Sequence, residues 1–203
     1  AVRREEEEIA ARKSPSPPPS PISAIYEDLT LQAAAGGGHM NVVRWRVLRD
    51  AVPIDLIDVE GWTALFAAAQ AGHLDIVEWL IDHGADVNTP CALLNFVTPL
   101  HVAAENDYDD VVELLCKHGA RVNETDDNGC TPLFTAAQNG RRCAVEALID
   151  AGADMFQGDN DSYMPMHVAV QNGHVDVVLS LAAMAKNRVL DVVNIRDMDG
   201  FTP

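Results

Sequence analysis

The sequence TPLHVA at residues 98–103 decides the fold, because related stretches recur along the chain at a nearly constant interval. The corresponding stretches begin at Thr63, Thr131 and Met164, so that successive starts are 35, 33 and 33 residues apart. An alanine-rich segment and then a second apolar run follow each start, and three of the units close with Gly-Ala. Self-similarity at a fixed period of this length predicts an array of structural repeats.

Each of these stretches predicts the start of a short helix. A threonine at the N-cap accepts a hydrogen bond from a free amide of the first turn, and a proline after it fills a position whose N–H has no partner. The second apolar run, such as residues 74–81, predicts a second helix that begins near Asp75 and ends at Gly84 in a left-handed conformation. Each unit is therefore read as helix, turn, helix and an extended tip of about ten residues.

The motif and its period resemble the ankyrin repeat family, most closely at residues 98–103. The resemblance implies an all-α ankyrin-repeat solenoid of about five repeats, in which each repeat is a helix-turn-helix with a β-hairpin tip. The units start near residues 29, 63, 98, 131 and 164, and Thr202-Pro203 opens a sixth unit that is cut off at 202, so that the C-terminal stacking face should be bare. Aligning Gly38 on Gly72 places Leu29 and Leu31 at the Thr and Leu positions of the first unit.

Residues 1–28 have a different composition, and we expect them to form a disordered leader ahead of an ankyrin repeat domain at 29–203. Prolines are dense between residues 15 and 21, and apolar side chains are too few to offset the entropy of ordering. Ser14, Ser16 and Ser20 each precede a proline, as in sites of proline-directed kinases. The leader also fits the PxxP spacing of a ligand for an aromatic-lined groove, and a plain linker is the alternative to both.

The charge and the cysteines limit the partners and the compartment. With 14 Lys and Arg against 31 Asp and Glu, the net charge is −17, which disfavours nucleic acid and anionic membranes as partners. No stretch is apolar and uninterrupted enough to insert into a membrane, and no secretory signal is visible. The four cysteines lack CxxC spacing, which indicates neither disulfides nor zinc. These features favour the cytoplasm, with the nucleus left open.

No catalytic, metal-binding or cofactor-binding motif stands out, and we expect a protein that is not an enzyme and uses no metal or cofactor. All seven histidines fall on repeat positions, without HExxH spacing, and no GxSxG motif occurs. The glycines at 36–38 lack the Lys-Ser/Thr of a phosphate loop, and the acidic stretches at 126–129 and 159–161 lack the remaining ligands of a calcium loop.

The resemblance also implies a non-catalytic protein–protein interaction scaffold that binds a partner on its concave surface. That surface consists of the tips and the exposed face of each first helix. The implied tip positions are Val59, Glu60, Trp62, Leu94, Asn95, Val97, Asp127, Asn128, Asn160, Asp161 and Tyr163. The implied helix positions are Gln70, Glu105, Asn106, Gln138, Asn139, Gln171 and Asn172.

Three features of this surface refine the prediction. The stretch at 91–96 is two residues longer than the other tips and apolar, and it either contacts a partner or folds back on its neighbours. Trp62 and Tyr163 are either aromatic anchors for a partner or packing residues. Residues 29–203 contain 10 Lys and Arg and 25 Asp and Glu, a net charge of −15, so we expect a neutral to basic partner segment.

Two other functions stay open at this point. Asn88 and Asn123 stand in contexts that resemble the sites of an asparaginyl hydroxylase acting on ankyrin repeats, although an asparagine here also bridges the hairpin backbone in the family. The second alternative is that the array serves as the regulatory or substrate-recruiting module of a larger enzyme, such as a kinase or a ubiquitin ligase.

Overall fold

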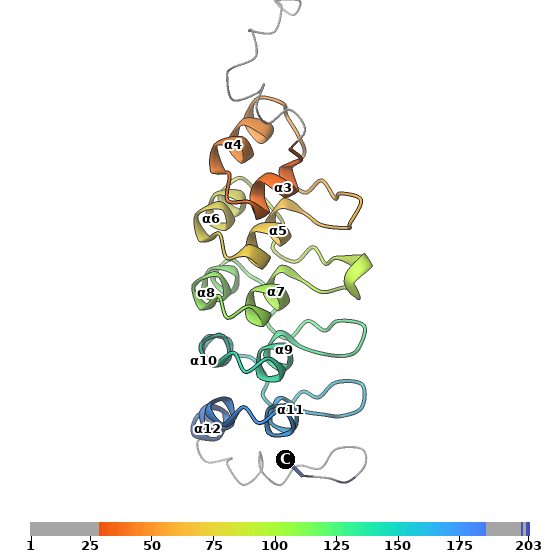
Figure 1. The fold of residues 1–203 in the computed structure, drawn as a ribbon, viewed down its shortest axis with the longest axis vertical. Coiled ribbons are helices and arrows are strands. Elements are labelled where there is room, and N and C mark those ends of the chain that lie inside the picture. Colours follow the sequence, from red (N-terminus) through yellow and green to blue (C-terminus); the bar gives the residue numbers. More distant parts are fainter. Residues whose placement is uncertain (1–28, 186–199, 201) are drawn as a thin grey trace, which may run out of the picture.

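The computed structural model describes residues 29–185, 200, 202 and 203, and within that part of the chain five helix pairs stack along one axis (Figure 1). The inner helices are α3 (Leu31–Gly36), α5 (Ala64–Ala71), α7 (Pro99–Glu105), α9 (Pro132–Gln138) and α11 (Pro165–Gln171). The outer helices are α4 (Met40–Leu48), α6 (Leu74–Asp82), α8 (Asp109–Lys117), α10 (Arg142–Asp150) and α12 (Val175–Met184). The predicted leader and the end of the fifth unit, 186–199, lie outside the described residues.

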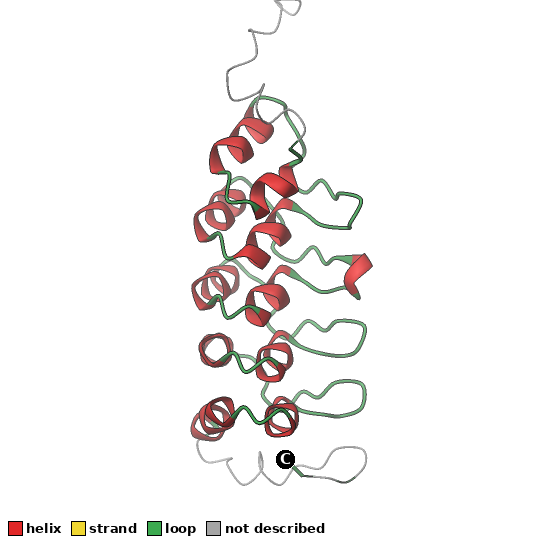
Figure 2. Ribbon diagram, viewed as in Figure 1, coloured by secondary structure: helices red, strands yellow, loops and turns green. Residues whose placement is uncertain are grey.

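The connections between successive helix pairs project from the inner column as loops, which we call the first tip (50–62), second tip (84–97), third tip (119–130) and fourth tip (152–163) (Figure 2). Over the described ranges the backbone forms helices and loops but no named strand, so the all-α repeat fold is confirmed. The second tip contains a short 3-10 turn, η1 (Ala92–Leu94), and a single β-bridge between Cys91 and Val97.

The inner helices begin where the repeated motif predicts. The side chains of Thr63 and Thr131 accept hydrogen bonds from the amides of Phe66 and Phe134, each at 3.1 Å. Proline occupies the first turn of α7, α9 and α11. The N-cap interpretation of the Thr-Pro pattern is therefore confirmed.

The first repeat corrects the predicted register by one residue. Thr30, not Leu29, is the N-cap of α3, and its hydroxyl accepts a hydrogen bond from the amide of Ala33 at 3.1 Å. A leucine offers no oxygen for this bond, so the helix starts at the neighbouring threonine. Aligning Gly38 on Gly72 assumes that both inner helices have the same length. Because α3 has only six residues, that alignment places its start too early.

One core runs through the described stack, and alanines of every inner helix belong to it. Ala68, Ala103 and Ala136 have no exposed surface, and their small side chains let neighbouring backbones approach closely. Larger side chains such as Ile76 and Leu115 fill the space between inner and outer helices. No single pair encloses a core of its own, so each repeat is stabilised by its neighbours.

Candidate partner-binding surface

The tips form one continuous surface because hydrogen bonds join each tip to the next. The Cys91 thiol of the second tip donates to the carbonyl of Glu60 in the first at 3.5 Å. The amide of Asp127 donates to the carbonyl of Asn95 at 2.9 Å. The amide of Asn160 donates to the carbonyl of Asn128 at 3.0 Å. The four tips are therefore fixed relative to one another.

The structure places the predicted binding positions on the tips and at the C-terminal ends of the inner helices. Most of these side chains are exposed: Val59, Glu60, Leu94, Asn95, Glu105, Asp127, Asn128, Gln138, Asn139, Asn160, Asp161, Gln171 and Asn172. The remaining five are half-buried: Trp62, Gln70, Val97, Asn106 and Tyr163. The set is thus contiguous in space although it is spread over more than a hundred residues of sequence.

The two aromatic side chains predicted as anchors, Trp62 and Tyr163, pack on the helices that follow them. The Trp62 ring lies 5.5 Å from that of Phe66, and the Tyr163 ring lies 5.9 Å from that of His167, measured between centroids. Both belong to the half-buried shell around the core. These contacts give Trp62 and Tyr163 a structural role, and both side chains stay partly exposed.

The long second tip packs on its neighbour and also keeps part of its apolar surface exposed. Cys91 is buried, and Leu93 lies so close to Gly61 that a Cβ at Gly61 would come within 3.2 Å of Leu93 Cγ. The tip therefore folds back on the first tip. Its remaining apolar surface stays in solvent, with Leu93 67% and Phe96 47% exposed.

An apolar groove lies between α3, the first tip and α5, and the sequence analysis missed most of it. Its volume is about 1110 Å³, and its lining includes Leu56, Ile57, Val59, Trp62 and Gln70. Leu56 and Ile57 were not among the predicted positions. The signal that could have found them is their position among apolar residues in a loop, where polar residues are usual.

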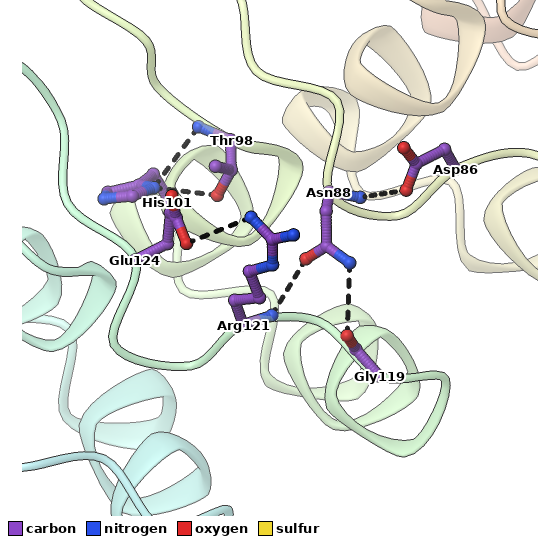
Figure 3. A network of polar contacts seen from close by, with 7 residues as sticks. All are labelled: Asp86, Asn88, Thr98, His101, Gly119, Arg121 and Glu124. Carbon is purple, nitrogen blue, oxygen red and sulfur yellow. Dashed lines mark hydrogen bonds and ion pairs between the residues drawn. The ribbon is translucent and has the colours of Figure 1, made fainter.

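Asn88 links the second repeat to the third (Figure 3). Its side chain donates to the carbonyl of Gly119 at 3.2 Å and accepts from the amide of Arg121 at 2.9 Å. The side chain of Asn123 accepts from the amide of Asp154, one repeat later, at 2.9 Å. Both contacts support the structural role of these asparagines, and their hydroxylation stays a prediction.

His101 is also used for structure. Its Nδ1 accepts a hydrogen bond from the amide of Thr98 at 3.2 Å, and its Nε2 donates to the carbonyl of Cys130, in the third tip, at 3.0 Å. Burial lowers the pKa of His101 and so favours the neutral ring that makes both bonds. At the same position of the fifth repeat, His167 Nδ1 accepts from the amide of Met164 at 3.1 Å.

The four cysteines are free, and three of them are unsuited to act as nucleophiles. Burial raises the pKa of Cys116 to about 11, and burial together with Asp126 raises that of Cys130 to about 12. The pKa of Cys143 is raised chiefly by the nearby carboxylate of Asp107. Since the thiolate is the reactive form, the raised pKa values disfavour reaction at these three thiols.

The described residues lack both a cluster of metal ligands and a membrane-spanning helix. They contain no group of three or more His, Cys, Asp or Glu side chains arranged to hold a metal ion. None of the helices in this part of the chain has the length and apolar character needed to cross a membrane.

The geometry agrees with the comparison with known protein families. A family model described as ankyrin repeats, in three copies, matches residues 23–91 and 100–197. The gap between the two matches covers most of the second tip's unusual stretch. No curated protein matches the chain at a significant level. Because the family model covers most of the sequence and the described residues form the repeated helix pairs it implies, the chain belongs to the ankyrin repeat family.

Proposed function

We propose that this array binds a partner protein along the face formed by its tips and inner helices, and that it does so without catalysis. Ankyrin repeats are generally protein–protein interaction modules and are typically non-catalytic. The observation that carries the proposal is that polar and apolar side chains are exposed together on four tips and their inner helices, and that hydrogen bonds join each tip to the next. A fixed surface of this kind loses little conformational entropy on binding.

The chemistry of the surface favours a neutral to basic partner. Residues 29–203 carry a net charge of −15, and the third and fourth tips expose the carboxylates of Asp127 and Asp161. Electrostatic attraction of this kind accelerates association and is screened by salt. We therefore expect the affinity to fall as the salt concentration rises.

Affinity capture from a cell extract followed by mass spectrometry tests the proposal. Gln138→Arg combined with Gln171→Arg places two cations on the exposed ends of α9 and α11, where the side chains support no contact that the fold needs. The matched control, Asn41→Arg with Ala183→Arg, adds the same charge to the exposed surface of α4 and α12.

We expect the inner-helix variant to lose captured proteins that both the wild type and the control retain. Equal capture by all three proteins, or loss in the control alone, would contradict binding at this face.

A further inference from the structure

The exposed apolar side chains are concentrated on the first and second tips. Ten large apolar side chains are strongly exposed in the described part of the chain, and six of them lie on these two tips: Leu56, Ile57, Val59, Leu93, Leu94 and Phe96. The second tip packs on the first, because Leu93 approaches Gly61 and the Cys91 thiol donates to the carbonyl of Glu60. The six side chains therefore form one surface beside the apolar groove, and we call it the apolar tip surface.

The same part of the chain holds most of the negative charge. Residues 50–116 contain 13 Asp and Glu and no Lys or Arg, a charge of −13 out of the net −17. Arg46 lines the groove as well, but it is engaged by the carboxylate of Asp50 at 3.1 Å and by the carbonyl of Leu29. The apolar tip surface is therefore also the most acidic part of the array in sequence.

The carboxylates of the first tip are held in place by backbone amides. Asp58 Oδ1 accepts from the amides of Glu60 and Trp62, each at 2.9 Å, and all three residues line the groove. Asp55 Oδ1 accepts from the amide of Asp86, in the second tip, at 3.0 Å. A cleft that combines one sign of charge with low-dielectric walls concentrates the electric field and attracts the opposite charge.

Phe96 is an apolar side chain on a backbone that suits glycine. The residue two positions before the N-cap of the inner helix is Gly61 in the first tip and Gly129 in the third, with φ of 82° and 79°. In the second tip this residue is Phe96, with φ of 60°. A bulky side chain is disfavoured in this region, and the ring is 47% exposed rather than part of the core. Folding alone would favour glycine here, which supports a role for the ring in binding.

We infer that the apolar tip surface and the groove bind a segment of a partner protein in which apolar side chains are flanked by Lys or Arg. The apolar side chains enter the groove, and the basic side chains lie against Asp58 and Glu60. A purely apolar segment would remove water from these carboxylates without replacing it, and a purely basic segment would leave the apolar side chains in water. The inference rests on the proposed function and specifies the chemistry of its partner.

A second copy of the chain is a poor occupant of this site. Its net charge of −17 repels the same charge on the first copy. Its own apolar tip surface also lies within residues 50–116, which supply no Lys or Arg to meet the carboxylates.

Three synthetic peptides test the inference on the full chain. The first has a leucine-rich centre between lysine-rich ends, the second has serine in place of leucine, and the third has glutamate in place of lysine. Fluorescence anisotropy at low and high salt measures the affinity of each. We expect the first peptide to bind about tenfold more tightly than either of the others, because each of those lacks one part of the matching chemistry.

A photo-reactive group in the centre of the first peptide locates the site. It should cross-link to residues 52–62 and 91–97, which form the groove and the apolar tip surface. Cross-links confined to the third and fourth tips or to the outer helices would overturn the inference.

One pair of variants tests the apolar contacts. Ile57→Ser with Val59→Ser, both exposed in the groove lining, should weaken binding of the first peptide about tenfold without changing its salt dependence. The matched control, Val175→Ser with Leu179→Ser, removes exposed apolar side chains from α12 and should bind as the wild type does.

A second pair tests the carboxylates. Asp58→Asn with Glu60→Gln keeps an oxygen to accept the amides of the first tip and removes both charges, so the salt dependence of binding should flatten. Glu78→Gln with Asp82→Asn makes the same change of charge on the exposed surface of α6, within residues 50–116, and should leave the salt dependence as it is.

Phe96→Gly separates binding from folding. This variant should weaken binding of the first peptide, while urea unfolding should show a protein at least as stable as the wild type, because glycine tolerates a positive φ. A less stable variant with unchanged binding would show that the ring serves the fold.

The inference fails if the first peptide binds no more tightly than the other two, or if neither pair of tip variants changes its binding. It also fails if the full chain rejects all three peptides because residues 1–28 or a second copy occupy the groove. When protein capture still depends on Gln138 and Gln171, these results leave the proposed function standing and refute only the chemistry inferred for the partner. When capture is independent of both residues, the proposed function itself fails.

Discussion

The carboxylate of Asp107, at the turn of the third repeat, accepts a hydrogen bond at 3.1 Å from the amide of Ala144, in the first turn of the fourth repeat's outer helix. Arg141, the N-cap residue of α10, makes no capping hydrogen bond with its own side chain. One repeat therefore caps a helix of the next. Asp107 makes this contact from a backbone with φ of 64°, at the position where other repeats have Gly72, Gly140 and Gly173.

Replacing Asp107 tests this inter-repeat cap. Asp107→Ala keeps the unfavourable backbone and loses the acceptor, so the free energy of unfolding should fall by about 1–2 kcal/mol. Asp107→Asn retains an acceptor oxygen on a residue that tolerates positive φ, and it should stay within about 0.5 kcal/mol of the wild type. Urea unfolding followed by circular dichroism measures both. Equal stability of the alanine variant would contradict the role of the cap.

The same carboxylate controls the reactivity of Cys143. Asp107 raises the pKa of this thiol by disfavouring the negatively charged thiolate. Asp107→Asn removes the charge, so the pKa should fall and the exposed thiol should react faster with iodoacetamide near neutral pH. Mass spectrometry of Cys143 labelling over time gives the rate, with Cys116 as the internal reference. A rate at Cys143 that is the same in both proteins would refute the electrostatic effect.

His101 should make stability depend on pH. The pKa of His101 is lowered in the folded protein from its ordinary value of about 6.5. Below that pH the unfolded chain therefore binds a proton at His101 more readily than the folded protein does. The stabilising contribution is therefore complete above about pH 6.5 and is lost as the pH falls towards the lowered pKa, by at most about 1.4 kcal/mol per pH unit.

Comparing unfolding free energies between pH 7 and pH 5 for the wild type and His101→Gln measures this contribution. The difference between the two proteins should shrink towards acid pH, and His118→Gln, at an exposed position, is the control. A difference that is constant across the range would contradict the account.

Met164 stands where the other four inner helices of the described residues have a threonine N-cap, and it has no hydroxyl to cap α11. Met164→Thr should supply the bond that Thr63 and Thr131 make at 3.1 Å and raise the free energy of unfolding by about 0.5–1 kcal/mol. Thermal unfolding monitored by circular dichroism measures the gain, and Met164→Ala shows the effect of removing the methionine alone. A lower melting temperature for the threonine variant would show that the methionine contacts matter more than the cap.

The sequence predicted the helices and their ends because the signals are local. The threonine at the N-cap, the proline after it and the glycine at the end of the outer helix act within one turn of the backbone, and they recur in phase. The predicted binding positions follow from the same register, which is why they share one face. Only the first repeat shifts by a residue, because Thr30 caps α3 in place of Leu29.

The contacts between repeats could not be predicted in the same way, because they join residues about one period apart. Asp107 departs from the glycine of the pattern, and only the fold shows that its side chain reaches Ala144. The approach of Leu93 to Gly61 likewise depends on how far the second tip bends towards the first.

Hydrogen–deuterium exchange of the chain, alone and bound to a captured partner, tests the central claim most directly. If the partner lies on the tip and inner-helix face, binding should slow exchange in the four tips and at the ends of α5, α7, α9 and α11, while α6, α8 and α10 stay unchanged. Slower exchange confined to the outer helices would contradict the account.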